Sequence, residues 1–277
     1  MAKTTYSYSR LTTFEQCNYS YFKQYILKEN GSDNVYSLLG SVTHDVVEAL
    51  QENKMTIEEG LNKFDDEWEL ARVLGFKFIS NKVEENYIAS IRHYIANFEP
   101  IHGTSCEIEK KIELDVDGHK LVGYIDLVIH NSDGTVSIYD FKTSSKFEKS
   151  KLDKYGRQLV IYALAMEQLG YKVRNVHWAM IKYASIAGKG NRTKTVQRSE
   201  IDLFDECQPL FVTYEITEEN KQKCKEWIVN TIEEIESKDE LFGYWEENYN
   251  SFFCQNLCNY GHCCERCKKE KRNYWNK

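Results

Sequence analysis

The chain contains little proline and no long apolar segment, and both absences narrow what it can be. Only 2 of its 277 residues are proline, so the sequence offers no obvious hinge and predicts one compact unit. No apolar run approaches the length of about 18 residues that marks a membrane-spanning helix, so no membrane insertion is expected. The first residues lack a basic and apolar secretory signal, which predicts a cytoplasmic location.

A nucleotide-binding loop and an excess of positive charge are also missing. The pattern G-x-x-x-x-G-K-[ST] does not occur, so the chain is not expected to hydrolyse ATP by itself. Its net charge of -7 argues against indiscriminate coating of nucleic acid. Basic residues nevertheless gather locally, with five Lys or Arg and no acid from 182 to 198. That stretch holds a glycine-rich loop in which Lys189 and Arg192 are candidate contacts to a phosphate backbone, with a solvated surface loop as the alternative.

A β-hairpin is predicted in the middle of the chain. Residues 121–130 and 135–141 are rich in Val, Ile, Leu, Tyr and Phe, and residues 131–134 between them are typical of a turn. A turn centred near Asp133 places Asp126 roughly opposite Asp140, with their Cβ atoms about 5 Å apart on one face. The hairpin therefore brings two carboxylates together.

The amine of Lys142 belongs to the same predicted arrangement. Lys142 lies two residues beyond Asp140 and so shares its face of the strand. Facing carboxylates repel each other unless a cation sits between them. An oxygen-rich site with few protein ligands suits Mg²⁺ or Mn²⁺, which can polarise a phosphoryl oxygen and activate a water molecule. The alternative is a solvated hairpin with scattered charges.

The motifs around this hairpin resemble those of a known family. Gly-Tyr-Ile-Asp at 123–126, followed by Ile-Tyr-Asp-Phe-Lys-Thr at 138–143, is similar to the metal-binding and catalytic motifs of the PD-(D/E)XK nuclease superfamily. The resemblance is to its RecB-like branch, which includes iron-sulfur nucleases of CRISPR adaptation and of the AddB subunit. Residues 40–44 resemble that branch's G-x-x-x-H motif, and residues 158–162 its Q-x-x-x-Y motif. The order along the chain agrees throughout.

The resemblance implies a fold, a domain organisation and a set of site residues. The fold is α/β, a restriction-endonuclease-like core with a central mixed sheet flanked by helices. A single nuclease domain of residues 1–277 is expected, with a helical region at 1–103, a catalytic core at 104–185, and a last helix and cysteine segment at 186–277. The implied metal ligands are His44, Asp126, Asp140 and the carbonyl of Phe141, while Lys142 orients or activates water and Gln158 and Tyr162 contact DNA or brace the centre.

Two of these positions have simpler interpretations from the residues alone. In a helix with an apolar face, His44 is as well explained as a buried, hydrogen-bonded histidine, and the four-residue spacing of Gln158 and Tyr162 also suits packing. The family sometimes has a glutamate upstream of the first aspartate, and Glu109 is the nearest candidate. Together with Glu107 and Glu113, however, Glu109 is more simply part of a charged edge strand.

Nine cysteines are too many to ignore, and five of them crowd the C-terminal end. Reduced thiols are expected in a cytosol, which favours metal binding over disulfides. The spacing of Cys254, Cys258 and Cys264 resembles the C-terminal triplet of iron-sulfur RecB-like nucleases, whose fourth ligand corresponds to Cys17. Thiolates hold a 4Fe-4S cluster as a set of four, and this one would join the two chain ends.

Departures from the family pattern leave other ligand sets open. Several relatives have two residues, not three, between the first two C-terminal cysteines, and Cys263 and Cys267 offer further combinations. A structural zinc site built from Cys264 and Cys267 with His262 or Cys258 is the runner-up. Free thiols are a third possibility.

Secondary structure is expected in the order helices, β-β-β-α-β, and a final helix. Expected helices cover 9–27, 41–53, a segment opened by a capping box from Thr56 to Glu59, a segment from Val83 to Phe98, residues 155–169 closed by Gly170, and a last helix opened by Thr217; expected strands cover 107–116, 121–130, 135–142, 173–183 and 210–216.

The expected function is that of a metal-dependent deoxyribonuclease, an exonuclease acting on DNA ends or single strands. The resemblance implies recombination, repair, phage or CRISPR DNA processing in a bacterial or phage-infected cytosol, beside a recombinase, helicase or integrase. A catalytically silent module that binds DNA ends or a protein is the alternative from another class. An RNA-directed or structure-specific endonuclease of the same fold is a second alternative.

Overall fold

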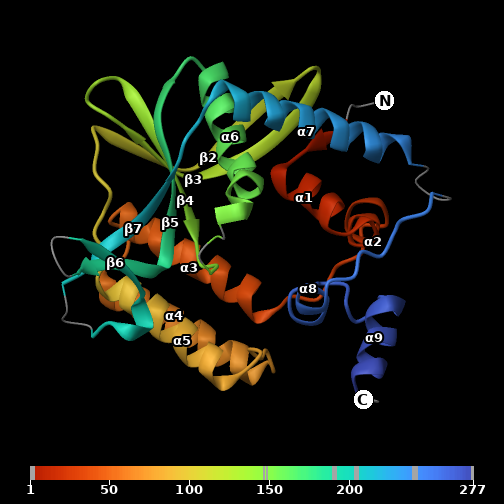
Figure 1. Ribbon diagram of the computed structural model, residues 1–277. Coiled ribbons are helices and arrows are strands. Elements are labelled where there is room, and N and C mark those ends of the chain that lie inside the picture. The colour runs from red at the N-terminus through yellow and green to blue at the C-terminus, as the bar shows by residue number, and fades with distance from the viewer. Residues whose placement is uncertain are drawn as a thin grey trace.

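A computed structural model describes residues 4–145, 147, 149–188, 192–202, 206–238 and 243–275. Figure 1 shows a central sheet with helices packed on both sides of it. The helices are α1 (Tyr8–Gln16), α2 (Asn18–Tyr21), α3 (Val35–Gln51), α4 (Ile57–Val73), α5 (Asn81–Ala96), α6 (Leu152–Gln168), α7 (Glu218–Ser237), α8 (Ser251–Asn256) and α9 (Glu265–Trp275). The strands are β1 (Thr5–Tyr6), β2 (Ser105–Val116), β3 (His119–His130), β4 (Thr135–Lys142), β5 (Lys172–Ala187), β6 (Thr193–Gln197) and β7 (Gln208–Tyr214).

The sheet is mixed, as the sequence predicts. Its strands run in the order β1-β3-β4-β5-β6, with β2 paired to β3 and β7 paired to β5. β2, β3 and β4 form an antiparallel meander, whereas β4 and β5 are parallel. Parallel neighbours need a crossover connection, and α6 supplies it. Thus the C-terminal end of β4 meets the N-terminal end of α6, at the edge where the predicted site residues lie.

Each face of the sheet carries its own apolar core. On one face, α1, α6 and α7 pack with strand residues such as Val128, Ile138 and Trp178. On the other face, α3, α4 and α5 cover Leu127, Phe141 and neighbouring side chains. Figure 1 shows α4 and α5 stacked outside α3, below the sheet. Residues that alternate along β3 and β4 therefore reach different helical layers, which fits the period of two in a strand.

Helix starts follow from side-chain capping. Thr56 accepts the backbone N–H of Glu59 while the Glu59 carboxylate accepts the N–H of Thr56, which confirms the capping box that the sequence predicts. Thr217 caps α7 in the same way with Asn220. Gly170 follows the end of α6 with a φ of +87°, a left-handed conformation that glycine adopts without strain.

The first predicted helix is not continuous. Instead of one helix over 9–27, α1 ends at Gln16, Cys17 takes an extended conformation, and α2 leads into a π-helical turn at Phe22–Ile26. Apolar and aromatic side chains recur at helical spacing there, so periodicity alone concealed the break at Cys17. Neither β1, β6, α8 nor α9 is predicted, because each is short or lies among loop-forming and cysteine-rich residues.

The C-terminal segment returns to the N-terminal helices. Tyr260 donates its hydroxyl hydrogen to the carbonyl of Glu29, and the Asn34 side chain donates to the carbonyl of Leu257, at 2.8 and 3.1 Å. Figure 1 shows α8 beside the loop that joins α2 to α3. Because Asn34 also caps α3, the cysteine segment is tied to the helix that carries His44. No helix within the described ranges is long and apolar enough to cross a membrane.

Candidate active site

The candidate site lies at a fork between β3 and β4. These strands are paired from Leu127 with Tyr139 to His130 with Val136, and the pairing stops there. Extending this register by one residue sets Asp126 opposite Asp140, so the predicted alignment of the two carboxylates is confirmed. Beyond that pair the strands separate, and α3 fills the end of the fork.

Asp126 connects the two strands and the helix. Its Oδ2 accepts a hydrogen bond of 2.6 Å from the backbone N–H of Phe141 and lies 3.6 Å from Nδ1 of His44. The His44 ring also meets the Phe141 ring edge-on, with centroids 6.2 Å apart. A glycine at position 40 helps α3 come this close, since a Cβ there would stand 3.4 Å from Oγ1 of Thr143. The four predicted metal-binding positions therefore converge.

Asp140 begins a second chain of polar contacts. The ammonium of Lys142 lies 2.6 Å from Oδ2 of Asp140 and donates to Oε1 of Gln158 at 3.0 Å. Gln158 in turn donates to the hydroxyl of Tyr162 at 2.8 Å. Tyr162 is only 5% exposed, so this geometry favours a bracing role for it: α6 fixes the lysine head against the carboxylate.

The electrostatics of the site favour an added cation. Burial raises the pKa of Asp126 well above its usual range, and the charge of Asp140 adds to this, while the Lys142 ammonium acts in the opposite direction. Burial also lowers the pKa of His44, which keeps its imidazole neutral and free to bind a metal near neutral pH. Without a metal, the paired carboxylates hold a proton where a cation would otherwise sit.

Two glutamates join this cluster. Glu109 has a φ of +46° opposite Asp126, where the β2–β3 pairing skips one residue pair. Burial and the nearby Glu109 carboxylate raise the pKa of Glu48 to about 7. Glu48 escaped the sequence analysis, although its position four residues after His44 places both on one face of α3.

The charged-edge interpretation holds for the other two glutamates of β2. Glu107 pairs with Lys110 and His130, and Glu113 pairs with Lys111. Glu109 is different because the irregular backbone at this residue brings its carboxylate to Glu48. A strand bulge re-aims one side chain without altering the rest of the ladder.

The donor set fits a hard divalent cation. One neutral imidazole, two carboxylates and a main-chain carbonyl match the ligands of Mg²⁺ or Mn²⁺. Oδ2 of Asp140 is buried, and its contact with Lys142 lacks hydrogen-bond geometry, so it keeps a lone pair for another partner. As placed, no three Cys, His, Asp or Glu side chains in the described part of the chain stand close enough together to hold an ion. Binding would draw them together.

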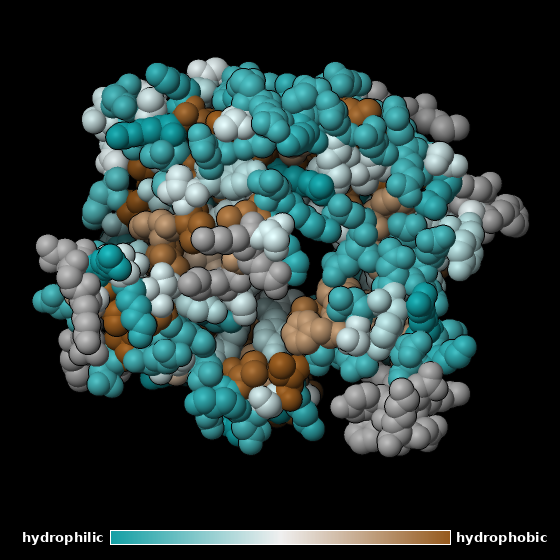
Figure 2. All heavy atoms as spheres, in the orientation of Figure 1, coloured by the Kyte–Doolittle hydropathy of each residue, from teal (hydrophilic) through white to brown (hydrophobic). Residues whose placement is uncertain are grey.

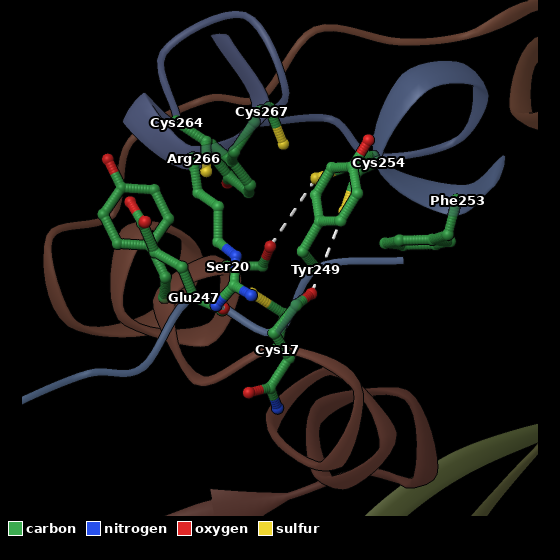
Figure 3. Close-up of a pocket in the computed structure, with 13 residues that line it drawn as sticks. Cys17, Ser20, Glu247, Tyr249, Phe253, Cys254, Cys264, Arg266 and Cys267 are labelled. Atoms are coloured by element: carbon green, nitrogen blue, oxygen red, sulfur yellow. Dashed lines mark hydrogen bonds between the residues drawn. The ribbon is translucent and has the colours of Figure 1, made fainter. Parts of the chain in front are cut away.

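A second cluster lies at the junction of the chain ends. Cys17, Cys254, Cys258, Cys264 and Cys267 line one pocket, so the four predicted ligands come together and Cys267 joins them. Figure 3 shows the thiols of Cys17, Cys254, Cys264 and Cys267 gathered around it. None of the cysteines in the described ranges forms a disulfide. The free space between the side chains is about 10 Å³, so a cluster needs them to spread.

Details of this pocket separate the possible ligands. Cys267 is 2% exposed, and its thiol lies within hydrogen-bonding reach of Cys254 and Cys264. Cys263 turns away and donates to the carbonyl of Tyr260. His262 is outside the pocket and lies 3.3 Å from the Ser32 hydroxyl. The variant of the zinc site that uses His262 therefore has no support in the geometry, whereas the variant with Cys258 remains open.

The predicted DNA-contacting loop is only partly described. Lys189 lies outside the described residues. Arg192 is exposed, and its carbonyl accepts the N–H of Gly188 in the turn between β5 and β6. Two other basic residues of the site region, Lys154 and Arg157 of α6, are already paired with Glu15 of α1.

Known proteins resemble this chain over different lengths. A 177-residue stretch, 58% of the chain, is 31% identical to a component of the ATP-dependent helicase/deoxyribonuclease, its B-type polypeptide, of Streptococcus agalactiae serotypes Ia and V. That stretch spans 16% of those much longer relatives. A solved structure described as a putative exonuclease from Eubacterium rectale aligns with 96% of the chain and 87% of its own, with a TM-score of 0.50 and 12% identity. It shows a shared α/β fold.

A family model covers almost the whole sequence. The model of the PD-(D/E)XK nuclease superfamily matches residues 5–265. This range includes the fork of β3 and β4, the histidine of α3 and every cysteine of the pocket except Cys267. The chain therefore belongs to the PD-(D/E)XK nuclease superfamily.

Proposed function

We propose that this protein is a divalent-metal-dependent deoxyribonuclease that removes nucleotides from DNA ends. The observation that carries the proposal is the fork, where Asp126, Asp140, His44 and the Phe141 backbone surround one point and Lys142 stands beside them. Bound Mg²⁺ or Mn²⁺ would polarise the phosphoryl oxygen and lower the pKa of a water molecule. All other roles fall to residues of this chain.

Lys142 is the catalytic lysine of the proposed reaction. Gln158 and Asp140 hold its ammonium at the mouth of the fork, so it can donate to the phosphate as negative charge develops there, or orient the attacking water. Asp126 and Asp140 supply the negative charge that keeps the cation in place. His44 contributes a neutral nitrogen. Water attacks phosphorus in line, the 3′-oxygen of the neighbouring sugar leaves, and a 5′-phosphate remains.

The decisive test uses Lys142→Ala with end-labelled single-stranded DNA and Mn²⁺. Loss of a group that moves a proton or stabilises developing charge lowers rates by about 10²- to 10⁴-fold, and we expect a loss in that range. Lys172→Ala removes the same charge at the far end of β5 and serves as the control. If the parent cleaves and Lys142→Ala cleaves equally fast, the assignment is wrong; a parent without metal-dependent cleavage would support the silent binding module.

The exonuclease part of the proposal depends on free ends. Linear and circular single strands of the same sequence separate the two modes, because an exonuclease degrades only the linear strand. An RNA strand tests the sugar preference. The similarity to a helicase/deoxyribonuclease component supports a helicase as the partner that would expose such strands, and a recombinase or integrase is the alternative.

We also propose that the five-thiol pocket holds a 4Fe-4S cluster with a structural role. Four buried thiols without disulfides, drawn from both ends of the chain, suit such a cluster. The pocket lies away from the fork, so no chemical step is assigned to it. Purification without oxygen should give a brown protein with four irons per chain. A colourless protein with one bound zinc would replace the cluster with the zinc site.

A further inference from the structure

A cavity of about 720 Å³ opens beyond the C-terminal end of β4. It begins at Thr143, the residue that follows Lys142, and extends between α5, the start of α6 and the cysteine segment. We call it the aromatic groove, and its characteristic side chains are Tyr36, Tyr87, Tyr155, Lys182, Tyr183 and Phe252. Figure 2 shows the surface hollowed in the middle of this face, between the two halves of the molecule.

A cation lies in the wall of this groove. Lys182 comes from β5, the parallel neighbour of β4, and its ammonium stands 5.2 Å from the centre of the Tyr87 ring. Burial lowers its pKa. Within the described ranges no carboxylate pairs with it, although carboxylates pair with many lysines elsewhere on the surface. A partly buried, unpaired cation beside a cavity favours an anionic ligand.

Polar groups line the end of the groove nearest the fork. The hydroxyl of Tyr87 is buried without a hydrogen-bond partner of good geometry, although the Thr143 side chain approaches it. Ser144 and Ser145 continue the lining beyond Thr143. Unused hydroxyl donors next to Lys142 suit phosphate oxygens close to the point of cleavage.

Aromatic faces line the rest of the groove. Phe252 of α8 is 54% exposed, an unusual position for a phenyl ring. Tyr155 stacks on Phe147 with centroids 4.6 Å apart, and Tyr36 meets Tyr87 edge-on. Every nucleobase has a π-face, so such rings bind unpaired bases with little regard to sequence. The bases of a duplex are already stacked on each other and do not offer these faces.

We infer that the aromatic groove binds the unpaired DNA strand that leads into the fork, with Lys182 on a backbone phosphate and Phe252 beneath a base. The inference rests on the proposed nuclease function and adds a strand preference and the residues that produce it. Size agrees: the cavity has the volume of a pocket for a small ligand, whereas the major groove of a duplex alone is about 12 Å wide. The cysteine segment then has a use, because it holds Phe252 and Leu257 in the wall.

The test is an equilibrium binding measurement in EDTA, where cleavage does not occur. Fluorescein-labelled oligo(dT) and a labelled blunt hairpin duplex are titrated with the full-length parent protein, Lys182→Met and Phe252→Ala. Methionine keeps the length of the buried lysine stem, and Phe252 is exposed, so both variants should fold. Lys172→Met, about 33 Å away along β5 at 3.3 Å per residue, and Tyr244→Ala, another exposed ring, are the matched controls.

We expect Lys182→Met and Phe252→Ala each to bind oligo(dT) about tenfold more weakly. The duplex affinity and both control variants should stay near the parent values. Lys182→Met should also lower the slope of log Kd against log salt by about 0.7, the value for one phosphate contact to a single strand, whereas Phe252→Ala should not change it. Lys182→Arg should restore the slope.

The inference is overturned if the two groove variants bind oligo(dT) like their controls, or if duplex binding falls in parallel with single-strand binding. These results do not depend on cleavage. A parent that cleaves DNA while its groove variants bind normally keeps the nuclease and removes the groove. A parent that never cleaves, but loses strand binding through Lys182, keeps the groove and removes the nuclease.

Discussion

At the scale of single residues, the site is defined by charges that the fold places unusually close together. Asp126, Asp140, Glu48 and Glu109 would repel one another in water, yet the fork and α3 hold them in one partly buried cluster. The fold tolerates this because protons or a bound cation can neutralise the cluster. Stability of the metal-free protein should therefore depend on pH in a direction that these residues determine.

Glu48 gives a measurable case. Its pKa rises from 4.5 to about 7 on folding, so between these pH values the folded state binds more protons than the unfolded state. The free energy of unfolding must then decrease as pH rises across this window. We expect Glu48→Gln, which cannot titrate, to be more stable relative to the parent at pH 8 than at pH 5.

Urea unfolding in EDTA at four pH values between 5 and 8 measures this difference. Asp126 has a raised pKa as well and contributes a decrease of the same sign in both proteins, so the comparison with the variant isolates Glu48. A difference between parent and variant that stays constant with pH would contradict the prediction. Added Mn²⁺ should reverse the trend, because metal binding requires deprotonated carboxylates.

At the scale of elements, the position of α6 is decisive. Its first turns carry Gln158, which holds Lys142, and they lie directly against β7. Gly156 makes this approach possible, since a Cβ at that position would stand 2.4 to 2.7 Å from the ring atoms of Tyr214. The glycine is therefore required by contact, even though its backbone is helical.

Gly156→Ala tests this contact through the sign of its effect. Alanine in place of glycine inside a helix normally stabilises by about 1 kcal/mol, but here the clash should lower the free energy of unfolding by roughly 1 to 3 kcal/mol. In a Tyr214→Ala background the ring is absent, and the same substitution should become stabilising. Chemical denaturation of the four proteins completes the cycle; additive effects would show that the ring does not determine the cost.

At the scale of the whole molecule, the two ends of the chain meet and are held by one thiol pocket. Cys17 precedes α2, and the other four thiols follow or begin the last two helices. Backbone contacts from Glu29 and Asn34 reach the same segment. A metal in this pocket would thus stabilise the closure of the ring formed by the chain and would leave the sheet core independent of it.

Cys17→Ser should separate closure from folding. We expect it to lose most of the bound iron and to be cleaved by trypsin near both ends, while its circular dichroism retains the helix and strand signals of the core. Cys106→Ser, at an exposed position in β2, and Cys263→Ser, outside the pocket, should keep the iron. Equal iron in all three variants would show that Cys17 is not a ligand.

Much of this protein was determined by local sequence. Alternating apolar residues, a turn at 131–134 and a fixed strand period set Asp126 against Asp140 and put Lys142 on the same face, because register in a hairpin follows from its turn. Capping residues such as Thr56 and Thr217 fixed helix starts for the same local reason. Five cysteines near one end indicated a metal site, but not which four of them would act.

Only the tertiary structure decided what reaches these local features from elsewhere in the chain. Glu48 and Glu109 enter the carboxylate cluster through a helix that packs on the sheet and through one irregular residue in β2. Lys182 and Phe252, seventy residues apart, become neighbours of one groove because β5 lies beside β4 and the last segment folds back. Such contacts join residues distant in sequence, and no local pattern of side chains records them.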